Sequence, residues 1–205
     1  MTEPAPAPGT PGTLILASAS PRRQELIRLL RIPFEVLPSA YEEHLPERHP
    51  SPGALAEHLA AAKAIDVARR HRQTWVLGAD TVVALGDRIY GKPADEVDGA
   101  RMLRELSGRT HQVMTGVALV RLDERDPVTR TFHAVTDVTF RELAEEEIAA
   151  YLRTGEPSDK AGAYAIQGYG GLLIREIRGD YPNVVGLPLT PLALLLRELG
   201  WSILE

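Results

Sequence analysis

Short apolar runs alternate along this chain with longer segments in which apolar residues recur at helical spacing. Residues 13–17 (TLILA) predict a buried strand, and residues 24–30 (QELIRLL) predict a helix. The leucines expected on the buried face of that helix are Leu26, Leu29 and Leu30. A second helix is predicted over residues 51–70, because a serine followed by a proline favours a helix start. Residues 75–85 (WVLGADTVVAL) then predict another buried strand.

The second half of the chain carries turn signals between further helices and β-rich stretches. Gly86 and Asp87 predict a turn, and an Asp- and Pro-containing link predicts a hairpin between two long β-rich stretches. The hairpin strands cover residues 111–122 and 131–140; helices are predicted over 95–106 (closed by Gly108), 144–154 and 190–200, and further strands over 171–178 and 184–187. Helices interleave with strands, yet a hairpin is present. The pattern therefore predicts an α/β fold with a mixed sheet.

Composition and charge narrow the class of protein. The chain has 205 residues, a formal net charge of -5 and only 5% aromatic residues. A general nucleic-acid or anionic-membrane binder usually carries a basic surface, so we expect neither nucleic acid nor membrane as a partner. An anionic substrate would then need a local cluster of cations.

The N-terminal residues and the lack of cysteine bear on organisation and location. Residues 1–12 are rich in Pro, Ala and Gly and predict a flexible tail, and residues 13–205 predict a single domain. The N-terminus lacks the basic start and apolar stretch of a secretory signal. The absence of cysteine excludes disulfides and thiolate zinc sites and suits a reducing, cytoplasmic location.

The segment Ser18–Arg23 (SASPRR) lies where a strand gives way to a helix. Ser20 can cap that helix and Pro21 can take its first position. A helix N-terminus offers free amide donors, and Arg22 and Arg23 could clamp phosphate oxygens there. The alternative is a capped surface helix with two solvated arginines.

Asp80 and Thr81 interrupt an otherwise apolar run. An ion in such a place is costly unless it is paired or binds a metal. Asp80 could hold a divalent ion or accept a proton from water, or it could simply cap a loop.

Three more charged residues are candidates for the same chemistry. Lys92 closes a G-x-x-x-x-G-K string, but Pro93 replaces the hydroxyl of a phosphate-binding loop, so a hairpin is the better interpretation. Lys92 could then contact a phosphate, or it could simply be solvated, as most lysines are. Lys63, in the second helix, could enter a cleft or run along the helix flank. Glu43, next to Glu42, could be a second metal ligand or part of a surface pair.

Residues 159–171 (DKAGAYAIQGYGG) are rich in glycine and small residues. Such a run permits tight turns and close approach to a ligand, and Gln167 could read the edge of a base. A mobile surface loop is the equal alternative.

Taken in order, SASPRR, GADT, GKP, SGRTHQVMTG, DKAGAYAIQG and VVGLP resemble the Maf family of nucleotide pyrophosphatases. The resemblance implies an α/β fold with an elongated mixed β-sheet flanked by helices and two lobes around a central cleft, like the house-cleaning inosine triphosphatases. It implies hydrolysis between the α- and β-phosphates of a nucleoside triphosphate, a divalent metal cation (Mg²⁺ or Mn²⁺), and a homodimer.

The resemblance also implies roles for individual residues. Asp80 matches the proposed proton acceptor and, with Glu43, the metal ligands. The implied phosphate-binding residues are Ser20, Arg22, Arg23, Lys63 and Lys92. Arg22, Thr81 and Gln167 match the selectivity positions of the dTTP/UTP subgroup, whereas the 7-methyl-GTP subgroup is expected to carry Trp, Gln and Glu there. A neutral Gln can donate to and accept from a uracil or thymine edge. A non-catalytic, nucleotide-binding regulator of cell division is the alternative function.

Overall fold

The protein, as a computed structural model, is described over residues 11–42, 51–123 and 127–205. These residues form one mixed sheet of seven strands: β1 (Leu14–Leu16), β2 (Phe34–Val36), β3 (Val76–Leu85), β4 (Arg88–Tyr90), β5 (Thr110–Arg121), β6 (Val128–Phe140) and β7 (Ile174–Arg178). The strand order is β2-β1-β3-β5-β6-β7, and β4 also pairs with β3. β1 runs parallel to β2 and β3, and every other pairing is antiparallel. The predicted mixed α/β class is thereby confirmed.

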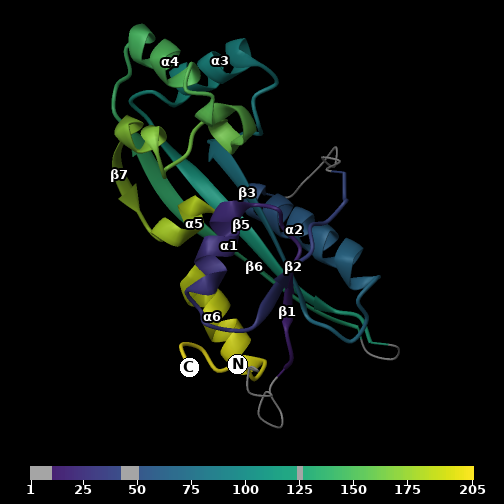
Figure 1. The fold of residues 1–205 in the computed structure, drawn as a ribbon. Coiled ribbons are helices and arrows are strands. Elements are labelled where there is room, and N and C mark those ends of the chain that lie inside the picture. Colours follow the sequence, from purple (N-terminus) through teal and green to yellow (C-terminus); the bar gives the residue numbers. More distant parts are fainter. Residues whose placement is uncertain (1–10, 43–50, 124–126) are drawn as a thin grey trace.

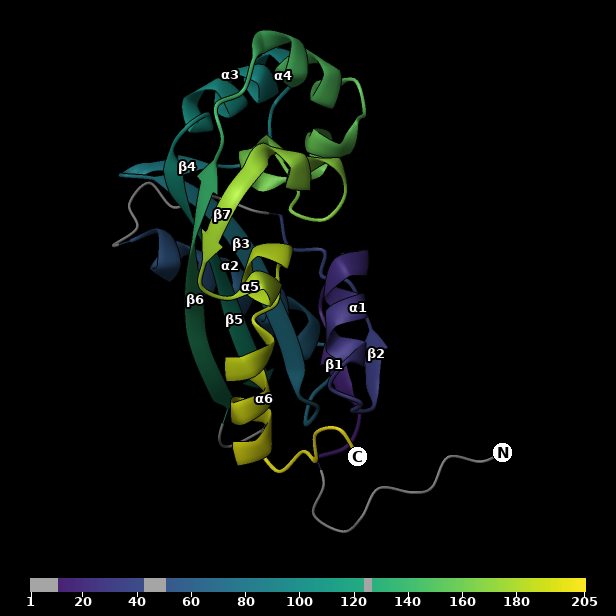
Figure 2. The ribbon, with the colours of Figure 1, turned by 90° about the vertical axis from the view of Figure 1, so that its left-hand side faces the viewer.

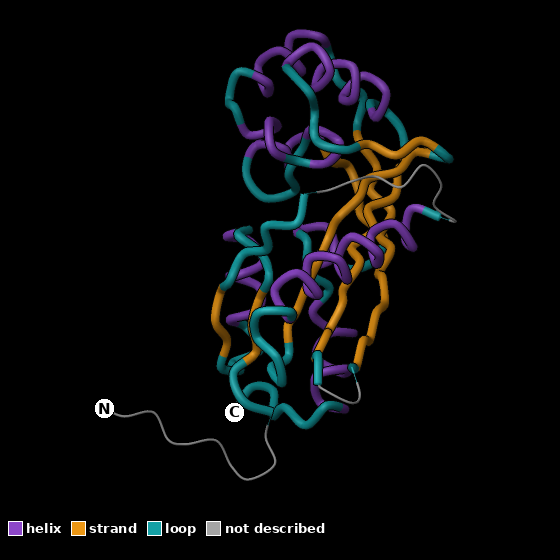
Figure 3. Tube along the Cα trace, turned by 90° about the vertical axis from the view of Figure 1, so that its right-hand side faces the viewer, coloured by secondary structure: helices purple, strands orange, loops and turns teal. Residues whose placement is uncertain are grey.

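Helices cover both faces of this long sheet (Figure 1). They are α1 (Pro21–Arg28), α2 (Pro52–Ala68), α3 (Glu96–Leu106), α4 (Glu145–Leu152), α5 (Tyr181–Val185) and α6 (Leu189–Glu198). Figure 3 shows α2 lying across the strands on one face, and Figure 2 shows α1, α5 and α6 beside the lower sheet with α3 and α4 above it. None of the helices in the described ranges is long and apolar enough to cross a membrane.

Apolar side chains form separate cores on each face of β3. On the face of α1 and α6, Leu77 and Ala79 belong to one core, whereas Val83 belongs to a second core formed with α3 and α4. On the α2 face, Val76 and Val82 likewise belong to two different clusters. The two cores beside α1 and α3 correspond to the two predicted lobes, and β3 runs continuously through both.

Two glycines allow α2 to lie unusually close to the sheet. A Cβ added to Gly78 would lie 2.1 Å from the carbonyl oxygen of Ala60, and one added to Gly116 would lie 2.2 Å from the carbonyl carbon of Ala56. No side chain fits at either place. The isolated glycines inside these strands therefore mark close approach of another backbone.

Several predicted elements need correction. Residues 184–187 are not a strand: Tyr181–Val185 is the helix α5, with Pro182 in its first turn, where a fixed φ suits a helix. The stretch before Ile174 is a 3-10 helix, so β7 is shorter than predicted. Leu29 is 59% exposed because Ile27 takes its place on the buried face of α1. The strand β2 was not predicted.

We expect Gly116→Ala to destabilise the protein, because its methyl group would push α2 away from β5. The loss in free energy of unfolding should be about 1–3 kcal/mol, as for overpacked cores. Gly91→Ala is the matched control, since a Cβ there meets no atom within 4 Å. Urea unfolding of both variants measures the difference. Equal stabilities would show that the close approach of α2 to β5 does not require a glycine at position 116.

Candidate active site

Asp80 and Thr81 lie in β3 where one edge of that strand lacks a neighbouring strand. β5 pairs along nearly the whole of the other edge. On the edge in question, β1 pairs with Val76 and Leu77, and β4 pairs with Val83–Leu85. Within the described ranges, no strand pairs with the stretch between them. The segment is therefore bordered by the loops that follow β1 and β4, which carry Ser20 and Lys92.

On the α2 face of β3, Asp80 forms an ion pair with Lys63. The Lys63 Nζ lies 2.5 Å from Asp80 Oδ1, and the two side chains are 15% and 10% exposed. Lys63 therefore projects from α2 toward the strand rather than along the helix flank. A buried pair of this kind is costly to break, because either partner alone would be an uncompensated charge.

On the opposite face, Arg23 joins three segments of the chain. Its Nε donates to the Gly186 carbonyl oxygen (2.8 Å), its Nη2 to Thr81 Oγ1 (3.1 Å) and its Nη1 to Ser18 Oγ (3.3 Å). Ser20 caps α1 as predicted, and its Oγ accepts from the Arg23 backbone N–H at 3.5 Å. The helix N-terminus and the guanidinium are thus held beside Thr81.

A directed chain of hydrogen bonds runs inward from Thr81. Thr115 Oγ1 must donate its proton to the Asn183 carbonyl oxygen (2.8 Å), so in its 2.9 Å bond with Thr81 Oγ1 it accepts. Asn183 also accepts from the Thr115 N–H through Oδ1 and donates from Nδ2 to Thr136 Oγ1. The Thr81 hydroxyl therefore donates its proton to Thr115 Oγ1. Toward a ligand, Thr81 can only accept.

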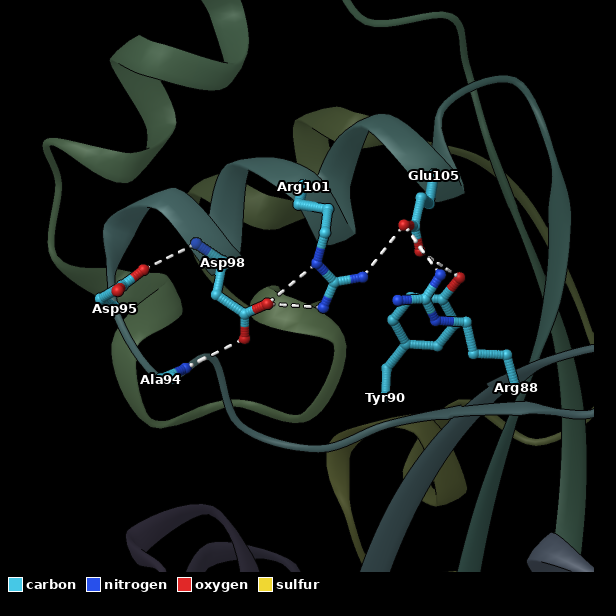
Figure 4. Close-up of polar contacts among 7 residues, drawn as sticks. All are labelled: Arg88, Tyr90, Ala94, Asp95, Asp98, Arg101 and Glu105. Carbon is cyan, nitrogen blue, oxygen red and sulfur yellow. Dashed lines mark hydrogen bonds and ion pairs between the residues drawn. The ribbon is translucent and has the colours of Figure 1, made fainter.

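Lys92 is exposed and lies in a loop whose two ends are fixed by a polar network (Figure 4). Before the loop, the Tyr90 hydroxyl donates to Glu105 Oε2 (2.8 Å); after it, the Ala94 N–H donates to Asp98 Oδ2 (3.1 Å). The remaining members of the network are Arg88, Asp95 and Arg101. The Lys92 side chain itself has no hydrogen bond or ion pair with the described residues, so it is available to a phosphate.

Arg22 lies in the first turn of α1, and Gln167 lies in the loop between residues 163 and 169. The pKa of Asp159 is lowered chiefly by its contact with Lys160, and in part by the positive charge of Arg22. The charge of Arg22 therefore reaches Asp159, at the end of the segment Glu156–Asp159. Gln167 is half-buried, and its side chain makes no hydrogen bond with the part of the chain that is described. That loop is tied to the Lys92 loop, because the Gly162 N–H donates to the Gly91 carbonyl oxygen at 3.0 Å.

The candidate residues thus gather from several elements, with one exception. Ser20, Arg23, Lys63, Asp80 and Thr81 surround one segment of β3, and Lys92 and Gln167 lie on two linked loops. Glu43 falls outside the described residues, and Glu42 beside it is exposed. The described ranges contain no group of three or more His, Asp or Glu side chains placed to hold a metal ion. Trp75 and Arg121 line two surface hollows, and none of the candidate residues lines either of them.

Other polar residues nearby have no local sequence signal. Thr115 and Asn183 are fully buried and hold the Thr81 segment against α5. His111 is buried against Phe140 and Tyr164, and burial lowers its pKa to about 4, so it is a neutral core residue at neutral pH.

Comparison with known proteins decides the family. A family model described as Maf-like protein matches residues 13–199. The chain belongs to the Maf family. It is 54% identical over 187 residues to a protein of Moorella thermoacetica named dTTP/UTP pyrophosphatase, covering 91% of this chain and 95% of that one. A protein of the same name from Ruminiclostridium cellulolyticum is 43% identical over 192 residues, covering 94% and 98%.

Among solved structures, the Maf chain is similar to a nucleoside-triphosphatase, dITP/XTP pyrophosphatase, from Mycobacterium abscessus. The TM-score is 0.47 at 18% sequence identity, with 92% of this chain and 98% of that one covered.

We expect Thr115→Val to destabilise the Maf protein, because it leaves the Asn183 carbonyl without its donor and the Thr81 hydroxyl without its acceptor. The loss should be about 1–3 kcal/mol in the free energy of unfolding. Thr139→Val is the matched control: Thr139 is also buried in the same strand pair, but its partner Thr110 (2.9 Å) is exposed, so water can replace the bond that Thr110 loses. If urea unfolding shows equal losses of stability in the two variants, the hydrogen-bond chain from Thr81 through Thr115 to Asn183 is not a special constraint.

Proposed function

We propose that this Maf protein hydrolyses dTTP and UTP to the nucleoside monophosphate and pyrophosphate. The observation that carries the proposal is the Lys63–Asp80 pair beside the Arg23–Thr81 pair, on the segment of β3 that has a neighbouring strand on one edge only. The named activity of relatives at 43% and 54% identity over most of the chain supports the same reaction.

The triphosphate binds to cations drawn from both sides of this segment. Arg22 and Arg23 lie in the first turn of α1, where backbone N–H groups and the helix dipole also favour an anion. Ser20 adds a hydroxyl at the same end. Lys63 and Lys92 approach from α2 and from the loop after β4. Because these residues come from separate elements, they can contact successive phosphates rather than one.

Asp80 is the proton acceptor for the attacking water. The water oxygen forms a bond to the α-phosphorus, the bond from that phosphorus to the bridging oxygen breaks, and pyrophosphate leaves. The Asp80 carboxylate takes the proton of the water, while Lys63 orients one of its oxygens.

A divalent cation, Mg²⁺ or Mn²⁺, fits the oxygen chemistry of this site. Hard cations take carboxylate oxygens and are commonly shared with substrate phosphates, so one or two carboxylates suffice for the protein's share. Asp80 would hold the ion together with Glu43. When bound, the ion supplies positive charge at the phosphate oxygens.

Arg22, Thr81 and Gln167 set the preference for pyrimidine bases. The Gln167 amide can donate and accept at a uracil or thymine edge. The Thr81 hydroxyl acts as an acceptor, because its proton is used by Thr115. We further propose that the enzyme is one domain over residues 13–205, acts in the cytoplasm and forms a homodimer.

A substrate panel tests the proposed function directly. We expect pyrophosphate, and no orthophosphate, from dTTP and UTP with Mg²⁺ or Mn²⁺, measured separately by phosphate assays. Pyrophosphate mainly from 7-methyl-GTP would overturn the selectivity assigned to Gln167. Nucleotide binding without turnover would favour the non-catalytic regulator.

Asp80→Asn tests the catalytic group. We expect kcat to fall by about 100-fold or more, because the proton acceptor is lost while the side chain keeps its shape. Asp87→Asn, in the exposed turn of the same hairpin, is the matched control and should keep its activity. Circular dichroism and urea unfolding establish that Asp80→Asn is folded. A folded variant with normal turnover would defeat the assignment.

A further inference from the structure

The loop that carries Gln167 passes from one apolar core to the other. Ala163 and Tyr164 are buried in the core beside α3 and α4, whereas Ile166 packs against the core beside α1 and α6. Leu173 returns the chain to the first core. The Gln167 side chain makes no hydrogen bond with the described residues, so other groups must determine where its amide points.

Glu156 and Tyr151 bind the backbone of this loop on both sides of Gln167. Glu156 Oε1 accepts from the Gly170 N–H (2.9 Å), and Oε2 accepts from the Tyr169 N–H (3.0 Å). The Tyr151 hydroxyl donates to Glu156 Oε1 (2.9 Å) and accepts from the Ala165 N–H (3.2 Å). One glutamate and one tyrosine thus hold the chain before and after Gln167, and we call this pair the loop clamp.

The clamp is itself held rigidly. Tyr151 lies in the last turn of α4 and is 5% exposed. Thr154 Oγ1 donates to the Tyr151 carbonyl oxygen (2.6 Å) and accepts from the Glu156 N–H (3.2 Å), which fixes the turn between the two residues. Burial raises the pKa of Tyr151, so its hydroxyl keeps the proton that it donates to Glu156.

Two glycines of the loop are required by the clamp. A Cβ on Gly168, which has a φ of 86°, would lie 2.3 Å from Glu156 Oε2. A Cβ on Gly170 would lie 2.2 Å from the Ala165 carbonyl oxygen and 2.7 Å from the Tyr151 hydroxyl. These glycines therefore permit close approach to the clamp.

We propose that Glu156 and Tyr151 are positioning residues for base selectivity: they hold Gln167 where its amide meets the pyrimidine edge. This inference rests on the proposed function, in which Gln167 reads the base. Neither residue is among those assigned above to the phosphates or to the attacking water, so we assign the clamp to the choice of substrate and not to the chemical step.

Glu156→Gln and Tyr151→Phe each remove part of the clamp with little change in shape. A glutamine at position 156 has one oxygen, so its NH₂ group must face either the Tyr169 N–H or the Gly170 N–H, where two donors repel. Phenylalanine at position 151 leaves the Ala165 N–H without its acceptor. Glu146→Gln, on the exposed side of α4, is the matched control.

The decisive measurement is the selectivity ratio, kcat/KM for dTTP divided by kcat/KM for GTP. We expect both clamp variants to lower this ratio by about fivefold or more through a higher KM for dTTP, with kcat at saturation within about twofold of the starting enzyme. Gln167→Ala should lower the ratio at least as far, and Glu146→Gln should leave it unchanged. Hydrogen exchange at Tyr169 and Gly170 should become faster in Glu156→Gln, which reports release of the loop.

The outcomes separate this inference from the proposed function. If Gln167→Ala lowers the ratio and the folded clamp variants do not, the inference fails while the proposed function stands. If the starting protein binds nucleotides but does not turn them over, the proposed function fails, and the ratio of dissociation constants for dTTP and GTP, measured by calorimetry, then decides the inference. Absence of binding to either nucleotide overturns both.

Discussion

The close contact of α2 with β3 and β5 is the constraint on which the site depends. The α2 backbone comes so near to Gly78 and Gly116 that a Cβ on either would overlap it. The same approach places the Lys63 ammonium 2.5 Å from Asp80. A wider spacing would separate two mostly buried charges that have little water to replace the lost partner. The glycines and the ion pair are therefore two consequences of a single packing geometry.

The polar segment of β3 also divides the apolar packing. On the face of α1, the core ends at Ala79 and a second core begins at Val83. Thr81 fills the interval, satisfied by Arg23 and Thr115. Since β3 and β5 continue through the division, strand pairing keeps the residues of both lobes in fixed register. The substrate-binding groups that we propose for each lobe can then meet at the boundary without a flexible joint.

Local patterns were sufficient for most of the fold and for part of the site. Asp80 stood out in the sequence because a charge inside an apolar run needs a partner, and α2 and the β5–β6 hairpin followed from periodicity and turn residues. The strand predicted over residues 184–187 was wrong, because an apolar run of four residues cannot distinguish a strand from a helical turn. Thr115 and Asn183 gave no signal, since their partners lie 34 and 68 residues away.

The glycine-rich loop shows why composition alone left its role open. Either a ligand or simple mobility explains glycines equally well in a sequence, but Gly168 and Gly170 face Glu156 and Tyr151. Both oxygens of Glu156 accept hydrogen bonds, from Tyr151, Tyr169 and Gly170, so the charge of this carboxylate is balanced within the clamp. Because the backbone supplies the anchoring bonds, the Gln167 amide keeps both its donor and its acceptor for the base that we propose it binds. The contacts of Glu156 and Tyr151 thus fix the backbone of the loop and leave the Gln167 side chain without an internal hydrogen bond among the described residues.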